Sequence, residues 1–185
     1  MTTAVDGNAT GRAAGTQARE WVKWMHEYLW SRWVTLTVGP SECRGWRTRG
    51  FRGGPAFAER QRVHRRKRLV SLGTSTGLVS AFKEEFVRFY EKAAQQRVSY
   101  VYVVEAGALG DHLHIHALLY CAVDVDCRRL AKAWRYGRAT VDVYDPTRGA
   151  AFYLGEKIGR GAHGYDISKR MPPRLDASRP VEVKG

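Results

Sequence analysis

The alternation of hydrophobic and polar positions divides the chain into short helices and strands. A spacing of three to four residues between hydrophobic positions predicts helices at 18–29, 78–94 and 126–134. Runs rich in β-branched and aromatic residues predict strands at 32–38, 99–105, 112–121 and 138–144. A last helix is expected at 148–158, capped by Thr147 or its neighbour.

The order of these elements indicates the fold class. After the first helix, the order strand–helix–strand is repeated twice, which is typical of an α+β protein with a ferredoxin-like split βαβ core. We expect one antiparallel sheet with helices on one face. The turn between strands 99–105 and 112–121 contains Gly107 and Gly110, so these two strands should form a hairpin.

The ends of the chain differ in composition from this central region. Residues 1–16 are rich in Thr, Ala and Gly and are predicted to form a disordered leader, and residues 173–185 a flexible tail. Residues 17–172 are then one domain, interrupted by a basic loop at 41–73. The sequence has no internal repeat and no GxxxxGK[ST] phosphate loop, so it does not encode an ATP-driven motor.

The charge of the chain points to a polyanionic partner. Lys and Arg total 31 against 18 Asp and Glu, a formal net charge of +13. Ten of the residues from Arg44 to Arg68 are basic and one, Glu59, is acidic, so phosphate is the expected counter-charge, although a solvated loop without a specific role has the same composition. Trp46 could also stack on unpaired bases. The predicted DNA contacts are Arg44, Trp46, Arg47, Arg49, Arg52, Arg65, Arg66, Lys67 and Arg68.

The location of the protein is predicted from segments and residue types that are missing. No run of eighteen apolar residues occurs, and residues 1–16 lack the apolar stretch of a signal peptide, so no membrane association is expected. The three cysteines, Cys43, Cys121 and Cys127, are odd in number and have no CxxC spacing. We therefore expect a reducing, cytoplasmic setting.

The strand at 112–121 carries three histidines in alternate positions. Alternate side chains of a strand share a face, so His112, His114 and His116 should point the same way. Glu105 ends the partner strand of the predicted hairpin, where it can lie beside His114 and His116. Two imidazoles and one carboxylate with open positions suit a catalytic divalent ion such as Mg²⁺ or Mn²⁺. His112 is a possible fourth ligand or a phosphate contact.

The last predicted helix carries a candidate nucleophile. Tyr153 and Lys157 are four residues apart and so share a helix face. A tyrosine hydroxyl beside a cation and a metal-bound phosphate can attack phosphorus. By themselves the two residues fit equally well a core tyrosine and a surface lysine. Tyr144 and Tyr165 are competing candidates, the first expected at a strand end and the second in a Gly-rich tail.

Taken together, these segments resemble the small rolling-circle replication initiators of the HUH endonuclease superfamily, found in plasmids and single-stranded DNA viruses. The resemblance covers roughly residues 31–172. It is carried, in the family's order, by the strand WVTLT at 33–37, Glu105 with HIHALL at 114–119, WRYG at 134–137, AFYL at 151–154 and SKR at 168–170.

The resemblance implies an activity. The chain would be a metal-dependent, site-specific single-stranded DNA endonuclease and strand transferase, acting at a replication origin through a 5′-phosphotyrosine intermediate. Tyr153 would be the nucleophile, Glu105, His114 and His116 the metal ligands, and host helicase and polymerase would act on the product. One departure concerns the lysine, which the family often places three residues after the tyrosine; Glu156 holds that position here and the lysine follows as Lys157.

Other functions fit parts of this pattern. An HUH transposase or a mobilisation relaxase would use the same active-site residues on another DNA. A ferredoxin-like module that binds RNA or DNA without catalysis would bind no catalytic metal and form no covalent adduct. A phosphoesterase that uses paired histidines as acid and base would need two H-x-S/T elements, and none of the six histidines is followed by Ser or Thr two residues later.

Overall fold

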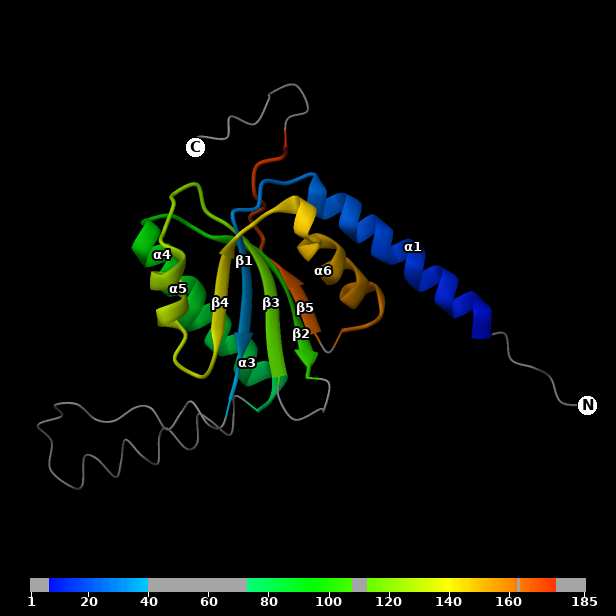
Figure 1. The fold of residues 1–185 in the computed structure, drawn as a ribbon, viewed down its shortest axis with the longest axis horizontal. Coiled ribbons are helices and arrows are strands. Elements are labelled where there is room, and N and C mark those ends of the chain that lie inside the picture. Colours follow the sequence, from blue (N-terminus) through cyan, green and yellow to red (C-terminus); the bar gives the residue numbers. More distant parts are fainter. Residues whose placement is uncertain (1–6, 40–72, 108–112, 163, 176–185) are drawn as a thin grey trace, which may run out of the picture.

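The computed structural model of the protein describes residues 7–39, 73–107, 113–162 and 164–175. It is an α+β fold built on a five-stranded antiparallel sheet with the strand order β4-β1-β3-β2-β5 (Figure 1). The strands are β1 (Arg32–Thr37), β2 (Ser99–Ala106), β3 (Leu113–Tyr120), β4 (Ala139–Val143) and β5 (Gly164–Ile167). The first four strands have the ferredoxin-like order that the sequence predicts, and β2 and β3 form the expected hairpin pair. The fifth strand was not predicted.

One face of the sheet is covered by the helices between β1 and β4. They are α3 (Ser75–Ala81), the π-helical segment η2 (Phe82–Val87), α4 (Arg88–Ala94) and α5 (Cys127–Ala133). The first three follow one another without a break, and the Thr74 side chain caps the first turn. Phe82 and Phe86 are fully buried and pack with Leu36 and Ile115 of the sheet. This is the larger part of the hydrophobic core.

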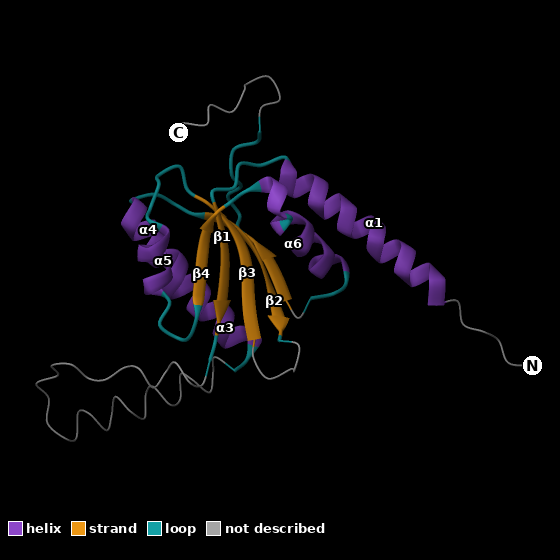
Figure 2. Ribbon diagram, in the orientation of Figure 1, coloured by secondary structure: helices purple, strands orange, loops and turns teal. Residues whose placement is uncertain are grey.

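The other face is also partly covered, which corrects the prediction that helices lie on one face. There α6 (Ala150–Gly159) packs over β2 and β3, and α1 (Gly7–His26) packs on α6 (Figure 2). Val101 and Val103 of β2 are buried beneath Leu154 of α6. The apolar run at 101–104 does not alternate because β2 is covered on both sides, as is usual for a strand between two layers.

A glycine lets the two helices of this second layer approach closely. A Cβ atom on Gly155 would lie 2.8 Å from Cγ2 of Val22 and 2.9 Å from the carbonyl oxygen of Ala18 in α1. The packing of α1 on α6 explains why α1 is long and stable enough to form although it carries several glycines in its first half.

The ends of the domain differ from the predicted boundaries. Helix α1 begins at Gly7, so residues 7–16 of the predicted disordered leader are helical, continuing a helix that packing already holds further along the chain. At the other end, the Leu29 amide donates to the Pro173 carbonyl at 2.9 Å, and the Leu175 amide donates to the Glu27 carbonyl at 2.7 Å. The beginning of the predicted flexible tail is therefore paired with the end of α1.

The last helix also begins later than predicted. A single 3-10 turn, η3 (Pro146–Arg148), precedes it, with the Asp145 side chain capping that turn. The N-cap of α6 is Gly149, with φ of 77°, rather than Thr147. None of the helices in the described ranges is long and apolar enough to cross a membrane. The basic loop with all nine of its predicted DNA contacts, and His112, lie outside the described residues.

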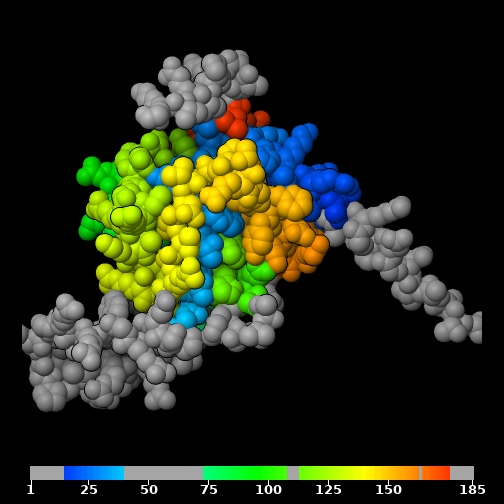
Figure 3. Space-filling model, in the orientation of Figure 1, coloured from blue at the N-terminus to red at the C-terminus, as the bar shows by residue number. Residues whose placement is uncertain are grey.

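The helices leave part of the second face open. In Figure 3, β1 and the adjoining part of β3 reach the surface between β4 and α6. The polar face of the histidine strand therefore opens to solvent beside α6.

Candidate functional site

Two predicted ligands, His114 and His116, lie on the open face of β3, with their rings oriented by the neighbouring strand. The register of β1 and β3 places Thr35 opposite His116 and Thr37 opposite His114. The Oγ1 of Thr35 lies 3.1 Å from Nδ1 of His116, and the Oγ1 of Thr37 lies 3.0 Å from Nδ1 of His114. Each ring is thus held through Nδ1, and its Nε2 is left for another partner.

Glu105, the third predicted ligand, lies opposite His114 on β2. Its Oε2 is 3.7 Å from Nε2 of His116. The same carboxylate accepts a hydrogen bond from the hydroxyl of Tyr153 and another from the ammonium group of Lys157. The hairpin and α6 therefore meet at Glu105.

Tyr153 contacts the histidines as well as the carboxylate. Its ring packs edge-on against the His116 ring, with centroids 4.9 Å apart, and Nζ of Lys157 lies 5.2 Å from the Tyr153 ring centroid. Lys157 reaches Glu105 from one helical turn after Tyr153, so the shift of the lysine by one position does not remove it from the site. Trp33 completes the group, stacked on His116 at 5.6 Å with an interplanar angle of 15°.

Burial and these contacts change the protonation of the group. Burial lowers the pKa of His116 to about 4, assisted by the positive charges of His114 and Lys157 and opposed by the attraction of Glu105. Burial raises the pKa of Tyr153, and its hydrogen bond to Glu105 raises it further. For Glu105, burial raises the pKa, but the hydrogen bonds from Lys157 and Tyr153 outweigh that effect and hold the pKa below its ordinary value. Near neutral pH the group contains a neutral imidazole, a protonated phenol and a carboxylate.

The site opens into a cavity of about 430 Å³ that borders β1, β2, β3, β4 and α6. Thr35, Thr37, Glu105, His114, His116 and Tyr153 line it, together with Arg138 and Thr140. An anionic substrate in this cavity would meet Arg138 and the neutral imidazoles together.

The competing tyrosines lie elsewhere. The Tyr144 hydroxyl is buried, has no hydrogen-bond partner among the described residues, and follows the end of β4. Tyr165 lies in β5 rather than in a Gly-rich tail, and its ring packs against Trp21 of α1 at 5.8 Å. Of the three candidates, Tyr153 is the one in contact with both His116 and Glu105.

The predicted metal ligands are neighbours but are not arranged around a common point. Among the described residues, no three His, Cys, Asp or Glu side chains are close enough together to hold a metal ion. The reason is visible in the contacts of Glu105, whose oxygens are directed toward Tyr153 and Lys157. A rotation of this side chain toward Nε2 of His116 would be required.

The segment at 134–137, which the sequence singled out without a role, clamps the end of β1. The Trp134 indole N–H donates to the Thr37 carbonyl at 3.0 Å, and the Gly39 amide donates to the Tyr136 carbonyl at 3.3 Å. Gly137 lies so close that a Cβ atom there would be 2.2 Å from the Thr37 carbonyl oxygen. This segment therefore fixes the position of Thr37, which in turn orients His114.

Sequence reasoning did not identify Thr35, Thr37, Trp33 or Arg138 as site residues. Thr35 and Thr37 alternate with the buried Val34 and Leu36, so the period of β1 could have placed them on an open face. The pairing of β1 with β3, which brings them to the histidines, follows from the ferredoxin-like order.

With this geometry described, the chain can be compared with known proteins. Residues 31–160 match the family of the replication-associated protein ORF2. The chain belongs to this family. The matched range runs from the residue before β1 through α6 of this replication-associated protein, so it contains every residue of the site described above. Neither curated protein sequences nor solved structures gave a significant match.

Proposed function

We propose that this replication-associated protein is a metal-dependent, site-specific single-stranded DNA endonuclease and strand transferase of the HUH type, which initiates rolling-circle replication. The observation that carries the proposal is the contact of Tyr153 with both His116 and Glu105. A nucleophile candidate thus adjoins two of the three candidate metal ligands. The membership of the replication-associated family supports a role at a replication origin.

The residues that would hold the metal are Glu105, His114 and His116. With Nδ1 donating to a threonine hydroxyl, each imidazole would present an unprotonated Nε2, the form that binds a metal. The lowered pKa of His116 keeps that ring neutral at physiological pH, which also favours metal binding. A bound Mg²⁺ or Mn²⁺ would neutralise charge on the non-bridging oxygens of the scissile phosphate.

The covalent step would be a transfer of the phosphodiester from a deoxyribose to Tyr153. The phenolic oxygen forms a bond to phosphorus, and the bond from phosphorus to O3′ breaks. The phenolic proton passes to Glu105, to which the hydroxyl already donates, and the departing O3′ takes a proton from solvent. The ammonium group of Lys157 lies beside the phenol and would favour its ionised form.

The products of this step explain a role in replication. The 5′ end of the cut strand stays linked to Tyr153, and the free 3′-hydroxyl can be extended by a host polymerase after a host helicase opens the duplex. Attack of a 3′-hydroxyl on the phosphotyrosine would reverse the transfer and join strands without ATP. The positive charge of the chain, concentrated between Arg44 and Arg68, supplies phosphate contacts for an origin hairpin or its single-stranded part.

A denaturing-gel assay tests this proposal. The full chain is incubated with Mn²⁺ and labelled single-stranded origin oligonucleotides, and a covalent protein–DNA band is expected. Tyr153→Phe and His114→Ala should each abolish the band, whereas Tyr144→Phe and Tyr165→Phe, which remove hydroxyls outside the site, should keep it. Nicking by Tyr153→Phe at the parent's level would overturn the proposal. Retained DNA binding with no adduct from the parent would instead favour a non-catalytic binding module.

A further inference from the structure

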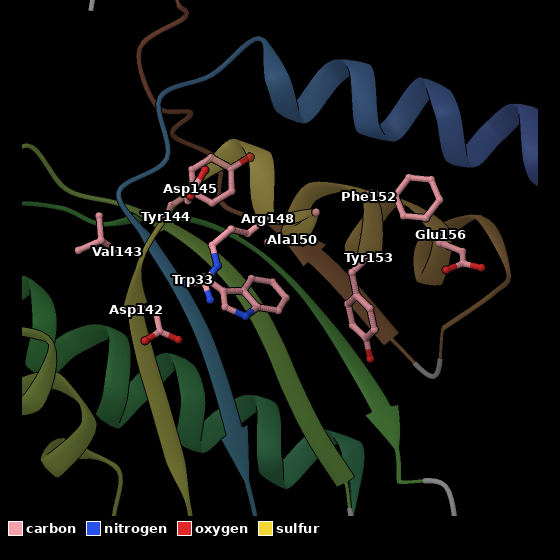
Figure 4. Close-up of a pocket in the computed structure, with 11 residues that line it drawn as sticks. Trp33, Asp142, Val143, Tyr144, Asp145, Arg148, Ala150, Phe152, Tyr153 and Glu156 are labelled. Atoms are coloured by element: carbon pink, nitrogen blue, oxygen red, sulfur yellow. The ribbon is translucent and has the colours of Figure 1, made fainter. Parts of the chain in front are cut away.

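A second cavity borders the site on the side of β4. Its volume is about 550 Å³, which lies within the range of small-molecule sites. It shares Tyr153 with the histidine cavity, so the two cavities meet at the proposed nucleophile. The side chains that matter for its chemistry are Trp33, Asp142, Val143, Arg148, Phe152 and Tyr153 (Figure 4).

Trp33 gives this cavity an aromatic wall. One face of the indole is stacked on His116, and its edge meets the Tyr153 ring at 6.2 Å and 80°. Trp33 lies between Asp142 of β4 and Tyr153 of α6 in Figure 4, so the rest of the indole borders the cavity. A flat ring placed there would extend the stack formed by His116 and Trp33.

Two apolar side chains at this cavity are unusually exposed. The exposed fractions are 66% for Val143 and 57% for Phe152, the highest among the large hydrophobic residues of the described part of the chain. Both border the same cavity, from β4 and from α6. Apolar groups gathered at a cavity beside a reactive centre indicate a ligand with an apolar face.

The charges of the cavity favour a base over a phosphate. Asp142, Asp145 and Glu156 line it, against one cation, Arg148. Asp145 is engaged by the amide and hydroxyl of Thr147, and Glu156 by Arg160 at 2.5 Å, which leaves Asp142 as the carboxylate best placed to accept a hydrogen bond from a ligand. Carboxylates repel phosphate but accept from the exocyclic amino group of cytosine.

We propose that this cavity binds one unpaired, amino-bearing nucleobase of the DNA strand, stacked on Trp33 and held between Val143 and Phe152. Its placement next to the scissile phosphate rests on the proposed function, because Tyr153 borders both cavities. The cavity would then select the nucleotide that flanks the nick and hold the strand in line with Tyr153.

Binding measurements without catalysis test the cavity separately from the nicking reaction. The Tyr153→Phe variant of the full chain, in chelator and at fixed salt, is titrated with labelled dC12, dT12 and an abasic 12-mer, and Kd is read from fluorescence anisotropy. Base stacking should make dC12 bind at least about five-fold more tightly than the abasic strand. In the same background, the Val143→Ala/Phe152→Ala pair should lower this ratio by about three-fold or more.

Two further variants complete the experiment. The pair Val123→Ala/Leu175→Ala removes two other exposed apolar side chains, 44% and 42% exposed, and should keep the ratio of the parent background. Asp142→Asn should reduce the preference for dC12 over dT12, two pyrimidines of similar size. An unchanged ratio in the cavity pair, or an equal loss of affinity for the abasic strand, would overturn the proposal.

The outcome also separates the two proposals. A normal covalent adduct from the parent with an unchanged ratio in the cavity pair would remove the nucleobase site and leave the nickase. A reduced ratio with no adduct would remove the nickase and leave a base-binding cavity.

Discussion

Thr35 and His116 face each other across β1 and β3, and the threonine Oγ1 lies 3.1 Å from the histidine Nδ1. The next pair toward the cavity mouth, Thr37 and His114, repeats the arrangement at 3.0 Å. Both contacts follow from the antiparallel register, which places two threonines of one strand beside two histidines of the next. The threonines are therefore positioning residues for the imidazoles.

Replacing Thr35 with Val should weaken metal binding while the fold is kept. Valine has nearly the shape of threonine and suits a strand, but it cannot hold Nδ1 of His116, so the ring loses its fixed orientation and tautomer. We expect the affinity for Mn²⁺, measured by calorimetry, to fall about 10- to 100-fold. Thr35→Ser should restore most of it.

Thr140→Val is the matched control for this substitution, because Thr140 borders the same cavity from β4. It should bind Mn²⁺ as the parent does. Equal Mn²⁺ affinity in Thr35→Val and the parent would show that the hydroxyl does not position His116.

Replacing Glu105 with Gln should lower the pKa of Tyr153. Burial raises that pKa first, and the carboxylate raises it further because it accepts the phenolic proton in a hydrogen bond and repels the phenolate. Glutamine removes the negative charge, so only the effect of burial would remain. The titration can be followed by NMR of chains with ¹³C-labelled tyrosine, with Tyr153→Phe identifying the signal. A pKa that stays the same or rises in Glu105→Gln would contradict this account of the site.

The metal-free protein should lose stability on acidification because of His116. Burial lowers the pKa of this ring to about 4, against an ordinary value of 6.5. Between these values the unfolded chain binds a proton that the folded chain does not, so the free energy of unfolding falls as the pH drops through this window. Above about pH 6.5 this group contributes no pH dependence. The full effect at pH 4 is at most about 3 kcal/mol.

Urea unfolding in chelator at several values between about pH 7.5 and 4.5 measures this effect. In His116→Gln, which cannot take up a proton, the loss of stability over the same window should be smaller by up to about 3 kcal/mol. Identical pH profiles for the two proteins would show that His116 is not the group responsible.

The sequence predicted the part of the site that depends on local pattern. Alternation along the strand placed His114 and His116 on one face, the glycine-containing turn paired that strand with the one ending in Glu105, and helical spacing placed Lys157 one turn after Tyr153. These inferences need only the periods of a strand and a helix. The structure brings these residues into one cluster, while their metal-binding and catalytic roles stay proposals.

The features that were missed depend on contacts between distant segments. Thr35 and Thr37 are ordinary residues for a strand, and only the pairing of β1 with β3 gives them a partner. The layer formed by α1 and α6 was missed because the polar histidine face was expected to be fully open, whereas Val103 on that face is buried. The fifth strand has four residues, too few for a period to be recognised.

Replacing Gly137 with Ala should destabilise the domain and disturb the site at its far end. The new Cβ atom would lie 2.2 Å from the Thr37 carbonyl oxygen and 2.8 Å from the Gly39 amide nitrogen, both backbone atoms, so the end of β1 has to move. The movement would strain the hydrogen bond from the Trp134 indole to the Thr37 carbonyl and displace the Thr37 hydroxyl from His114. We expect a loss of about 2–3 kcal/mol in the free energy of unfolding.

Gly39→Ala is the control for this substitution, since a Cβ atom there would meet no atom within 4 Å. It should change the free energy of unfolding by less than about 1 kcal/mol, measured by urea denaturation at one pH. Gly137→Ala should also bind Mn²⁺ more weakly than Gly39→Ala does, because Thr37 orients a proposed ligand. A Gly137→Ala protein as stable as the control would mean that the segment at 134–137 yields easily and does not fix the end of β1.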